Sequence, residues 1–177
     1  MTIEEILIQS SNIGTVKIAR KIGEKKFKEF LKNIKILESP KFELEELGKP
    51  IPFNWNKCKL ETISFGHGIT TTPLQAAAAY ASIINGGTLI IPTLKKGKNN
   101  EIKGKRIISK NTSKIMREIL RKVVTDEKGT ASLADIHGYE VSGKTGTSQY
   151  YDNSKKNINT FISFFSIGNK KYIILVM

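Results

Sequence analysis

The spacing of apolar residues changes once along the chain, near residue 139, and this change limits the possible fold more than any other feature. Before it, apolar side chains recur every three or four residues, a spacing that predicts helices with one buried side. After it, the segments YEVSGKTGT, TFISFFSI and YIILVM are rich in β-branched and aromatic residues, as strands are. We therefore predict an α+β (mixed) fold, with a mainly helical part over residues 1–140 and an antiparallel strand meander over residues 139–177.

Residues that favour helix ends mark the boundaries in the first part. A side-chain oxygen before the first turn and a glycine after the last turn are the usual signals. The predicted helices are a short one that begins at the capping box of Thr2 and Glu5, one that ends at Gly23, EKKFKEFLKNI, one from Thr72 and Pro73 to Asn85-Gly86-Gly87, and one after Ser109 with Ile115, Met116, Ile119, Leu120 and Val123 on one side.

The segments between these helices predict connections. Residues 35–63 contain three prolines and few periodic runs, which predicts a long loop. TLIIPTL predicts a brief extended piece, and KGKNNEIKGK predicts a polar turn or hairpin tip. Residues 168–171, GNKK, predict the hairpin turn between the last two strands.

The charge balance is strongly basic. The 177 residues contain 29 Lys and Arg against 16 Asp and Glu, which gives a net charge of +13. Nearly all of the excess is lysine spread along the chain without interleaved aromatic residues, so a solvated surface is favoured over a nucleic-acid interface. Cys58 is the only cysteine, which excludes an internal disulfide, and His67 and His137 lie far apart without metal-ligand spacing. We expect no metal and no cofactor.

Two short motifs carry the chemistry. The triplet SSN, residues 10–12, follows the first helix, so a hydroxyl and an amide are expected to project from a turn. The triplet KTG, residues 144–146, lies on the first predicted strand, where Gly143 and Gly146 are expected to let a substrate backbone approach. Acyl transfer at a serine needs a proton relay, a cation for an anionic substrate and backbone donors for the oxyanion. The first serine of SSN, the lysine of KTG and an exposed strand edge meet these needs.

The sequence around both motifs resembles the transpeptidase domain of the class B penicillin-binding proteins, within the penicillin-binding protein and serine β-lactamase superfamily. SSNIGTVKIARKIG is similar to the helix-turn-helix that carries the family's second motif, and ISFGHGITTTPLQAAAAYASIINGG is similar to the segment before its KTG strand. GTASLADIHGYEVSGKTGTSQ is similar to the approach to that strand and to the strand itself. SFGHG resembles the division-specific, septal branch. The resemblance covers nearly all of residues 1–177 and is weakest over residues 35–60.

The resemblance implies roles for Ser10, Asn12, Lys144, Thr145, Gly146 and Thr147. Ser10 would relay a proton toward the leaving group, and Asn12 would bind the substrate peptide and steady the family's active-site lysine. Lys144 would supply positive potential beside Ser10. Thr145 and Thr147 would bind the terminal carboxylate of a D-Ala-D-Ala stem or of a β-lactam, and the backbone N–H of Thr147 would be half of the oxyanion hole.

One part of the family's machinery is missing from the sequence. The 177 residues contain no Ser-x-x-Lys, which in the family supplies the nucleophile and its base. A covalent mechanism without its nucleophile keeps only residual catalysis. We therefore expect a partial transpeptidase domain, truncated at both ends, that does not acylate by itself. Its exposed alanine-rich helix and strand edge are expected to make it aggregation-prone.

The resemblance also implies the setting of the parent protein. The parent would cross-link peptidoglycan stem peptides by serine acyl transfer from D-Ala-D-Ala, act on a lipid-linked precursor polymer, bind β-lactams and work with a glycosyltransferase and other division proteins. It would be anchored in the bacterial inner membrane with this domain on the periplasmic side, although the 177 residues contain no run of about 18 apolar residues and no leader. Three alternatives stay open: a serine β-lactamase or penicillin sensor relative, a non-catalytic division scaffold or remnant, and a lysine-rich nucleic-acid binder.

Overall fold

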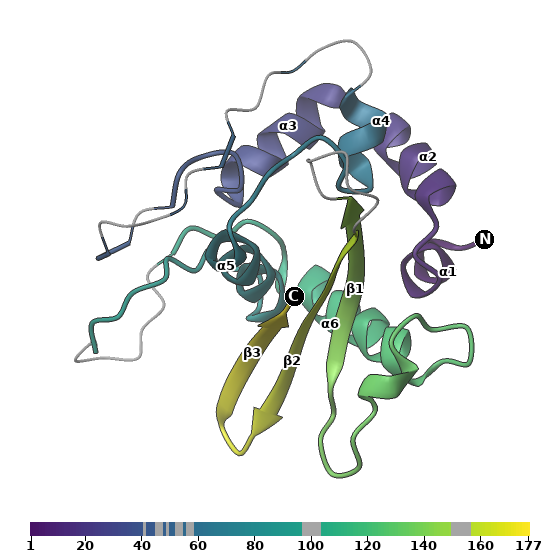
Figure 1. Cartoon of the computed structure of the whole chain (residues 1–177), viewed down its shortest axis with the longest axis vertical. Coiled ribbons are helices and arrows are strands. Elements are labelled where there is room, and N and C mark those ends of the chain that lie inside the picture. The colour runs from purple at the N-terminus through teal and green to yellow at the C-terminus, as the bar shows by residue number, and fades with distance from the viewer. Residues whose placement is uncertain are drawn as a thin grey trace.

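The helices precede the strands, as the change of apolar spacing predicts. The computed structural model describes residues 1–40, 42–44, 48, 50–51, 55, 59–96, 104–149 and 157–177. The elements are α1 (Ile3–Ile8), α2 (Asn12–Ile22), α3 (Glu24–Asn33), α4 (Lys59–Ser64), α5 (Pro73–Ile84), α6 (Lys110–Thr125), the 3-10 helix η1 (Ser132–Ala134), β1 (Ser142–Gln149), β2 (Asn157–Ile167) and β3 (Lys170–Val176) (Figure 1). The predicted α+β class is confirmed.

The three strands form an antiparallel sheet in the order β1-β2-β3, as predicted. The register places Lys144 opposite Ile162 and Thr147 opposite Asn159. Strands β2 and β3 are joined by a shorter turn than predicted, because Ile167 already pairs with Lys170. The sheet hydrogen bonding thus extends into the lysines that the sequence had placed in the turn.

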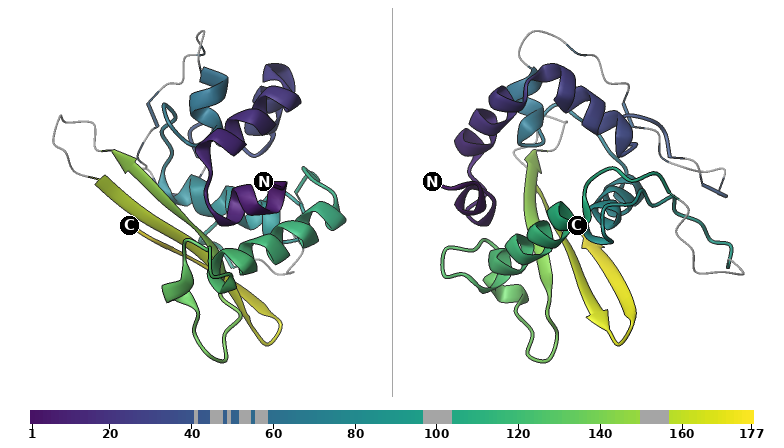
Figure 2. Two further views of the ribbon diagram at one scale, coloured as in Figure 1. Left: turned by 90° about the vertical axis from the view of Figure 1, so that its right-hand side faces the viewer. Right: turned by 180° about the vertical axis from the view of Figure 1, so that it is seen from behind.

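Helices α1, α5 and α6 lie on one side of the sheet (Figure 2). Helix α6 packs along β1, and α5 packs against β3. Ile84, Leu120 and Phe164 form the buried cluster between these layers. Side chains alternate along a strand, and Ile173 of β3 packs toward this cluster, so its neighbours Tyr172 and Ile174 point to the other side of the sheet. There they are 40% and 47% exposed, which leaves an apolar sheet face open to solvent.

Helices α2, α3 and α4 form a second group beyond the end of β1 (Figure 1). Leu31 and Ile34 are buried with Ile63 of α4, and Trp55 packs against this cluster. Helix α4 lies almost wholly inside residues 35–63, so the prediction of a loop was wrong there. Six residues are too few to show a helical period, and such a short helix depends on tertiary packing, here of Ile63.

A third cluster ties α1 to the region beside β1. Ile8 of α1 is buried with Val123 and Val124 of α6 and with Ala131, and Phe161 of β2 packs against this cluster. An ion pair between Lys122 and Glu4 also joins α6 to α1. The first helix is therefore held at a fixed position relative to the sheet.

The predicted helix boundaries are largely confirmed. Both partners of the Thr2 and Glu5 capping box are present, Thr72 caps α5 with Gln75 as its box partner, and Gly23 ends α2. Ile115 was predicted on the buried side of α6, but its side chain is 45% exposed. Ser113, two positions earlier and so on the opposite side of the helix, is buried instead and accepts a hydrogen bond from the Gly86 N–H.

The predicted connections are confirmed only in part. Among the described residues, the extended piece TLIIPTL makes a single bridge, between Thr88 and Arg106. Most of the predicted polar turn, KGKNNEIKGK, lies outside the described residues.

Candidate active site

Ser10 and Lys144 meet although 134 positions separate them in the sequence. The ammonium of Lys144 donates a hydrogen bond to Ser10 Oγ at 2.8 Å. It also donates to the backbone oxygen of Thr145 at 3.1 Å and lies 3.5 Å from Thr145 Oγ1. An ammonium has three donors and no acceptor, so these three oxygens use all its donors. Lys144 thus links the turn after α1 to strand β1, which is the meeting of SSN and KTG that the sequence predicted.

The backbone of the turn after α1 explains why Ser10 projects. Ser10 has a φ of 54°, in the left-handed region that non-glycine residues seldom adopt. The next residue, Ser11, caps α2 by accepting a hydrogen bond from the Gly14 N–H at 3.2 Å. A Cβ at Gly14 would lie 2.5 Å from the Ile6 side chain, so this glycine lets α1 and α2 pack closely. The Ser10 hydroxyl is therefore presented by a tight, well-packed turn.

Lys144 is partly withdrawn from water. Burial lowers the pKa of its ammonium, because the charged form loses part of its hydration shell. Lys144 lies on β1, and its ammonium reaches across to Ser10 in the turn after α1. The side chain therefore brings a positive charge into a half-buried position next to a serine hydroxyl.

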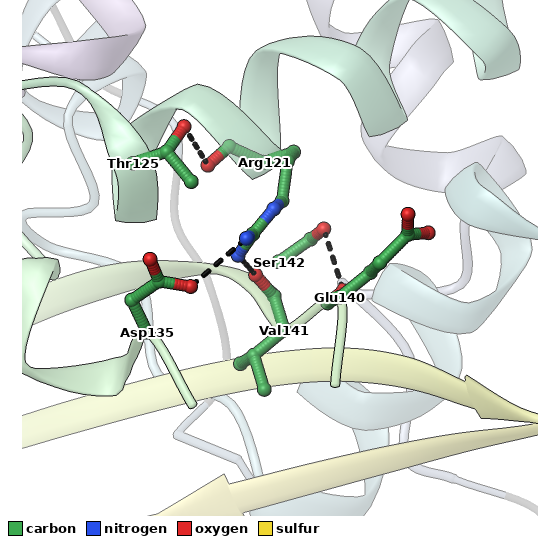
Figure 3. A network of polar contacts seen from close by, with 6 residues as sticks. All are labelled: Arg121, Thr125, Asp135, Glu140, Val141 and Ser142. Carbon is green, nitrogen blue, oxygen red and sulfur yellow. Dashed lines mark hydrogen bonds and ion pairs between the residues drawn. The ribbon is translucent and has the colours of Figure 1, made fainter. Parts of the chain in front are cut away.

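Arg121 of α6 fixes the start of β1 (Figure 3). Its guanidinium donates to the Val141 backbone oxygen at 2.6 Å and to Asp135 Oδ1 at 2.9 Å. The Thr125 hydroxyl donates to the backbone oxygen of Arg121 at 3.2 Å. One arginine thus holds both β1 and the segment that precedes it against α6.

The edge of β1 that faces away from β2 presents backbone groups. The carbonyls of Val141 and Thr145 accept from Arg121 and Lys144, so these carbonyls point away from the ladder with β2. In an antiparallel ladder the N–H and C=O of one residue point to the same side, and the side alternates along the strand. The N–H of Thr147 therefore lies on the same free edge as the carbonyl of Thr145.

The two threonine hydroxyls of β1 each have a partner that sequence reasoning missed. Thr145 Oγ1 lies 2.8 Å from Thr130 Oγ1, and Thr147 Oγ1 donates to Asn159 Oδ1 at 3.2 Å. The register of the β1–β2 pair would have pointed to Asn159, which is directly opposite Thr147. Thr130 stands in a loop without a periodic pattern, and the sequence carries no signal for its position.

The glycines on either side of Lys144 differ in function. A Cβ at Gly143 would lie 2.6 Å from the Ile162 backbone oxygen and 2.7 Å from the Phe161 ring, so this position is filled by β2. The prediction that a substrate backbone approaches Gly143 closely is therefore wrong. A Cβ at Gly146 would meet none of the described residues within 4 Å, so the described part of the chain leaves space beside Gly146.

Asn12 is less engaged than the other predicted site residues. It is the first residue of α2 and is exposed, and its side chain makes no hydrogen bond within the described part of the chain. The structure thus brings Ser10, Lys144 and Thr145 together and leaves Asn12 free beside them.

The residues that the structure describes contain neither a candidate metal site nor a candidate membrane-spanning helix. No group of three or more His, Cys, Asp or Glu side chains among them has the arrangement of a metal site. None of the helices in the described part is both long enough and apolar enough to cross a membrane.

Comparison with known proteins gives the family. The family described as the penicillin binding protein transpeptidase domain matches residues 1–177. The chain belongs to this family. The family predicted from SSN and KTG is therefore confirmed, and the match includes residues 35–60, where the resemblance was weakest.

Similar transpeptidase family proteins are longer than this chain. The chain is 32% identical over 192 residues to the probable peptidoglycan D,D-transpeptidase FtsI of Caulobacter vibrioides, covering 100% of the chain and 32% of that protein. It is 31% identical over 190 residues to stage V sporulation protein D of Bacillus subtilis, covering 97% and 29%. The transpeptidase domain of penicillin-binding protein 3 from Burkholderia pseudomallei superposes with a TM-score of 0.88 at 26% identity, covering 99% of the chain and 55% of that domain chain. The chain thus spans 32% and 29% of the length of these two curated relatives.

Proposed function

We propose that the chain forms one wall of the acyl-transfer site of a peptidoglycan D,D-transpeptidase. The observation that carries this proposal is the 2.8 Å hydrogen bond from Lys144 to Ser10, in a chain of the transpeptidase family. The hydrogen bond joins a cation and a serine hydroxyl next to a free strand edge, and acyl transfer needs these groups together.

Ser10 would act as the proton relay. Because Ser10 Oγ accepts from Lys144, its own proton is available to a substrate. The serine of a Ser-x-x-Lys segment, which this chain lacks, would attack the carbonyl of the penultimate D-Ala. The C–N bond breaks, and D-Ala leaves as an amine that gains, through Ser10, the proton that the attacking serine has lost. An amine of a neighbouring stem peptide then attacks the acyl carbonyl, the ester C–O bond to the serine breaks, and the proton that this amine loses returns along the same route to the serine.

The KTG strand would hold the substrate. Thr145 and Thr147 would bind the terminal carboxylate beside the positive charge of Lys144, Thr147 by giving up its hydrogen bond to Asn159. The open space at Gly146 would admit the substrate backbone, and the Thr147 N–H on the free edge of β1 would stabilise the oxyanion. Asn12, exposed and without a hydrogen bond in the described part, would bind the substrate peptide.

The parent protein would extend beyond the part described by this chain. Residues 1–140 would supply the helical side of the partial domain, and residues 139–177 would supply the KTG strand with the two strands after it. We propose that the parent is anchored in the bacterial inner membrane with this domain on the periplasmic side, at the division septum. Its partners would be stem peptides of the lipid-linked precursor polymer, β-lactams, a glycosyltransferase and other division proteins.

Mass spectrometry after incubation with benzylpenicillin tests the proposal. The chain alone is expected to gain no covalent adduct, because it has no Ser-x-x-Lys. The polypeptide encoded when the reading frame is extended upstream to include a Ser-x-x-Lys is expected to gain one penicillin. Ser10→Ala and Lys144→Met should each slow its labelling by roughly a hundredfold or more, the usual range for a group that assists proton transfer.

Other outcomes would replace the proposal. Stoichiometric labelling of the chain alone would contradict it. An upstream sequence without Ser-x-x-Lys would leave a non-catalytic scaffold or remnant as the function. Rapid turnover of nitrocefin by the extended protein would favour a β-lactamase instead.

A further inference from the structure

We propose that Thr130 is a positioning residue that turns the Thr145 hydroxyl toward the substrate carboxylate. This inference rests on the proposed function, because it assigns a partner to a hydroxyl of the same site. It starts from the 2.8 Å contact between Thr130 Oγ1 and Thr145 Oγ1. The two residues lie 15 positions apart, one in the loop after α6 and one on β1.

The direction of the hydrogen bonds around Thr145 decides what its hydroxyl can do. A hydroxyl has one proton to donate and two lone pairs to accept with. The Lys144 ammonium can only donate, and it lies 3.5 Å from Thr145 Oγ1. If Thr130 also donates, both lone pairs of Thr145 Oγ1 are used, and its proton is left for a ligand. A carboxylate favours this arrangement, because each donor in such a chain strengthens the next.

Thr147 shows the contrast. Its hydroxyl donates to Asn159 Oδ1 at 3.2 Å, so its single proton is already used. To bind a carboxylate, Thr147 would have to give up that hydrogen bond. With Thr130 as the donor of the hydrogen bond between them, Thr145 is therefore the hydroxyl that is ready to donate to a carboxylate.

Packing on both sides of Thr130 fixes its position. A Cβ at Gly129 would lie 2.3 Å from the Val123 backbone oxygen, so only glycine allows this approach to α6. Ala131 is buried in the cluster with Ile8 and Val123, and its N–H donates to the Val123 backbone oxygen at 3.2 Å. Thr130 is thus held between two anchored neighbours, while its own side chain stays exposed.

The contact between the two threonines is accessible to a ligand. Both line an open hollow of about 400 Å³ together with Phe161 and η1. Thr145 stands between this hollow and the Lys144 ammonium. A carboxylate at the free edge of β1 would therefore meet the Thr145 hydroxyl with Thr130 behind it.

The test uses the chain as it is and two ligands that differ only in the carboxylate. The chain has no Ser-x-x-Lys, so binding of benzylpenicillin is expected to be reversible, and the methyl resonances of Thr145 and Thr147 would follow it by NMR. Titrations of the wild type, Thr130→Val and Thr130→Ser are run with benzylpenicillin and with its methyl ester. Thr130→Val keeps the shape but removes the hydroxyl, whereas Thr130→Ser keeps the hydroxyl.

The expected result is weaker binding of benzylpenicillin, which carries the free carboxylate, and unchanged binding of its methyl ester. Thr130→Val should raise the dissociation constant for benzylpenicillin roughly three- to tenfold, the range of one net hydrogen bond, and leave that for the ester unchanged. Thr130→Ser should bind both ligands like the wild type. Equal losses for both ligands, or no loss for either, would overturn the role of Thr130. A wild-type chain that does not distinguish benzylpenicillin from its ester would instead overturn the proposed function, and the role of Thr130 with it.

Discussion

Replacing each of the two glycines of β1 by alanine is expected to separate an effect on folding from an effect on ligand binding. Gly143→Ala would place a methyl group 2.6 Å from the Ile162 backbone oxygen and 2.7 Å from the Phe161 ring. Gly146→Ala adds the same methyl group where no described residue lies within 4 Å. Neither glycine has a φ in the left-handed region, so alanine fits both backbones. The first change is expected to destabilise the fold, whereas the second is expected to stabilise it slightly and to weaken what binds next to Lys144.

The magnitude follows from the contacts. Overpacking a filled site costs about 1–3 kcal/mol, and replacing glycine by alanine returns about 0.4–1 kcal/mol by restricting the unfolded chain. Gly143→Ala should therefore lower the free energy of unfolding by about 1–2 kcal/mol, or the melting temperature by about 2–8 °C for a domain of this size. Gly146→Ala should raise the free energy of unfolding by up to about 1 kcal/mol.

Urea unfolding followed by far-ultraviolet circular dichroism, at low protein concentration, measures both changes. The ligand side is measured by the benzylpenicillin titration, in which Gly146→Ala is expected to bind more weakly than the wild type. A Gly143→Ala variant as stable as the wild type would refute the reasoning. So would a Gly146→Ala variant that loses as much stability as Gly143→Ala, because the two positions would then not differ in available space.

Two further predictions concern groups withdrawn from water. Burial lowers the pKa of Lys144 in the folded chain. Between this folded pKa and the unfolded value near 10.5, the unfolded chain keeps the Lys144 proton and the folded chain has released it. The free energy of unfolding therefore rises with pH over this range. Lys144→Met should therefore stabilise the fold most near neutral pH, and this gain in stability should shrink as the pH approaches 10.5. Urea unfolding of the variant and the wild type over this pH range measures the gain. A gain that is independent of pH would contradict the prediction. The Tyr80 hydroxyl is buried without a hydrogen-bond partner in the described part of the chain, and burial raises its pKa. Tyr80→Phe should raise the free energy of unfolding by about 1–2 kcal/mol in the same assay, and a loss of stability would mean that the hydroxyl has a partner.

The sequence predicted what local chemistry determines. The capping residues Thr2 and Thr72 and the glycine after α2 act within one turn, so their effects could be predicted from neighbouring residues alone. The meeting of Ser10 with Lys144 could be predicted because both belong to motifs that a known family shares.

The rest depended on tertiary contacts that no local pattern encodes. Helix α4 packs on α2 and exists because Ile63 is buried in the cluster that includes Leu31 and Ile34, whereas six residues show no period of their own. Gly143 was assigned to a substrate, but the packing of Phe161 across the strand explains it, and this contact forms only once β2 is paired. Thr130 reaches Thr145 through a loop whose path is set by packing on α6.

The separation of the buried clusters gives the molecule two independent optical reporters. Trp55, the only tryptophan, packs on the cluster of α3 and α4, with the Lys28 ammonium 4.2 Å from its ring centroid. On the open sheet face, Phe165 stacks on Tyr172 at 5.5 Å and meets Tyr139 edge-on at 5.9 Å. Indole fluorescence therefore reports on the second helical group, and the ring contacts of Tyr139 and Tyr172 with Phe165 make the near-ultraviolet circular dichroism of these two tyrosines sensitive to the state of the sheet. Denaturation curves from the two signals would coincide only if the SSN-bearing helices and the KTG strand unfold as one cooperative unit.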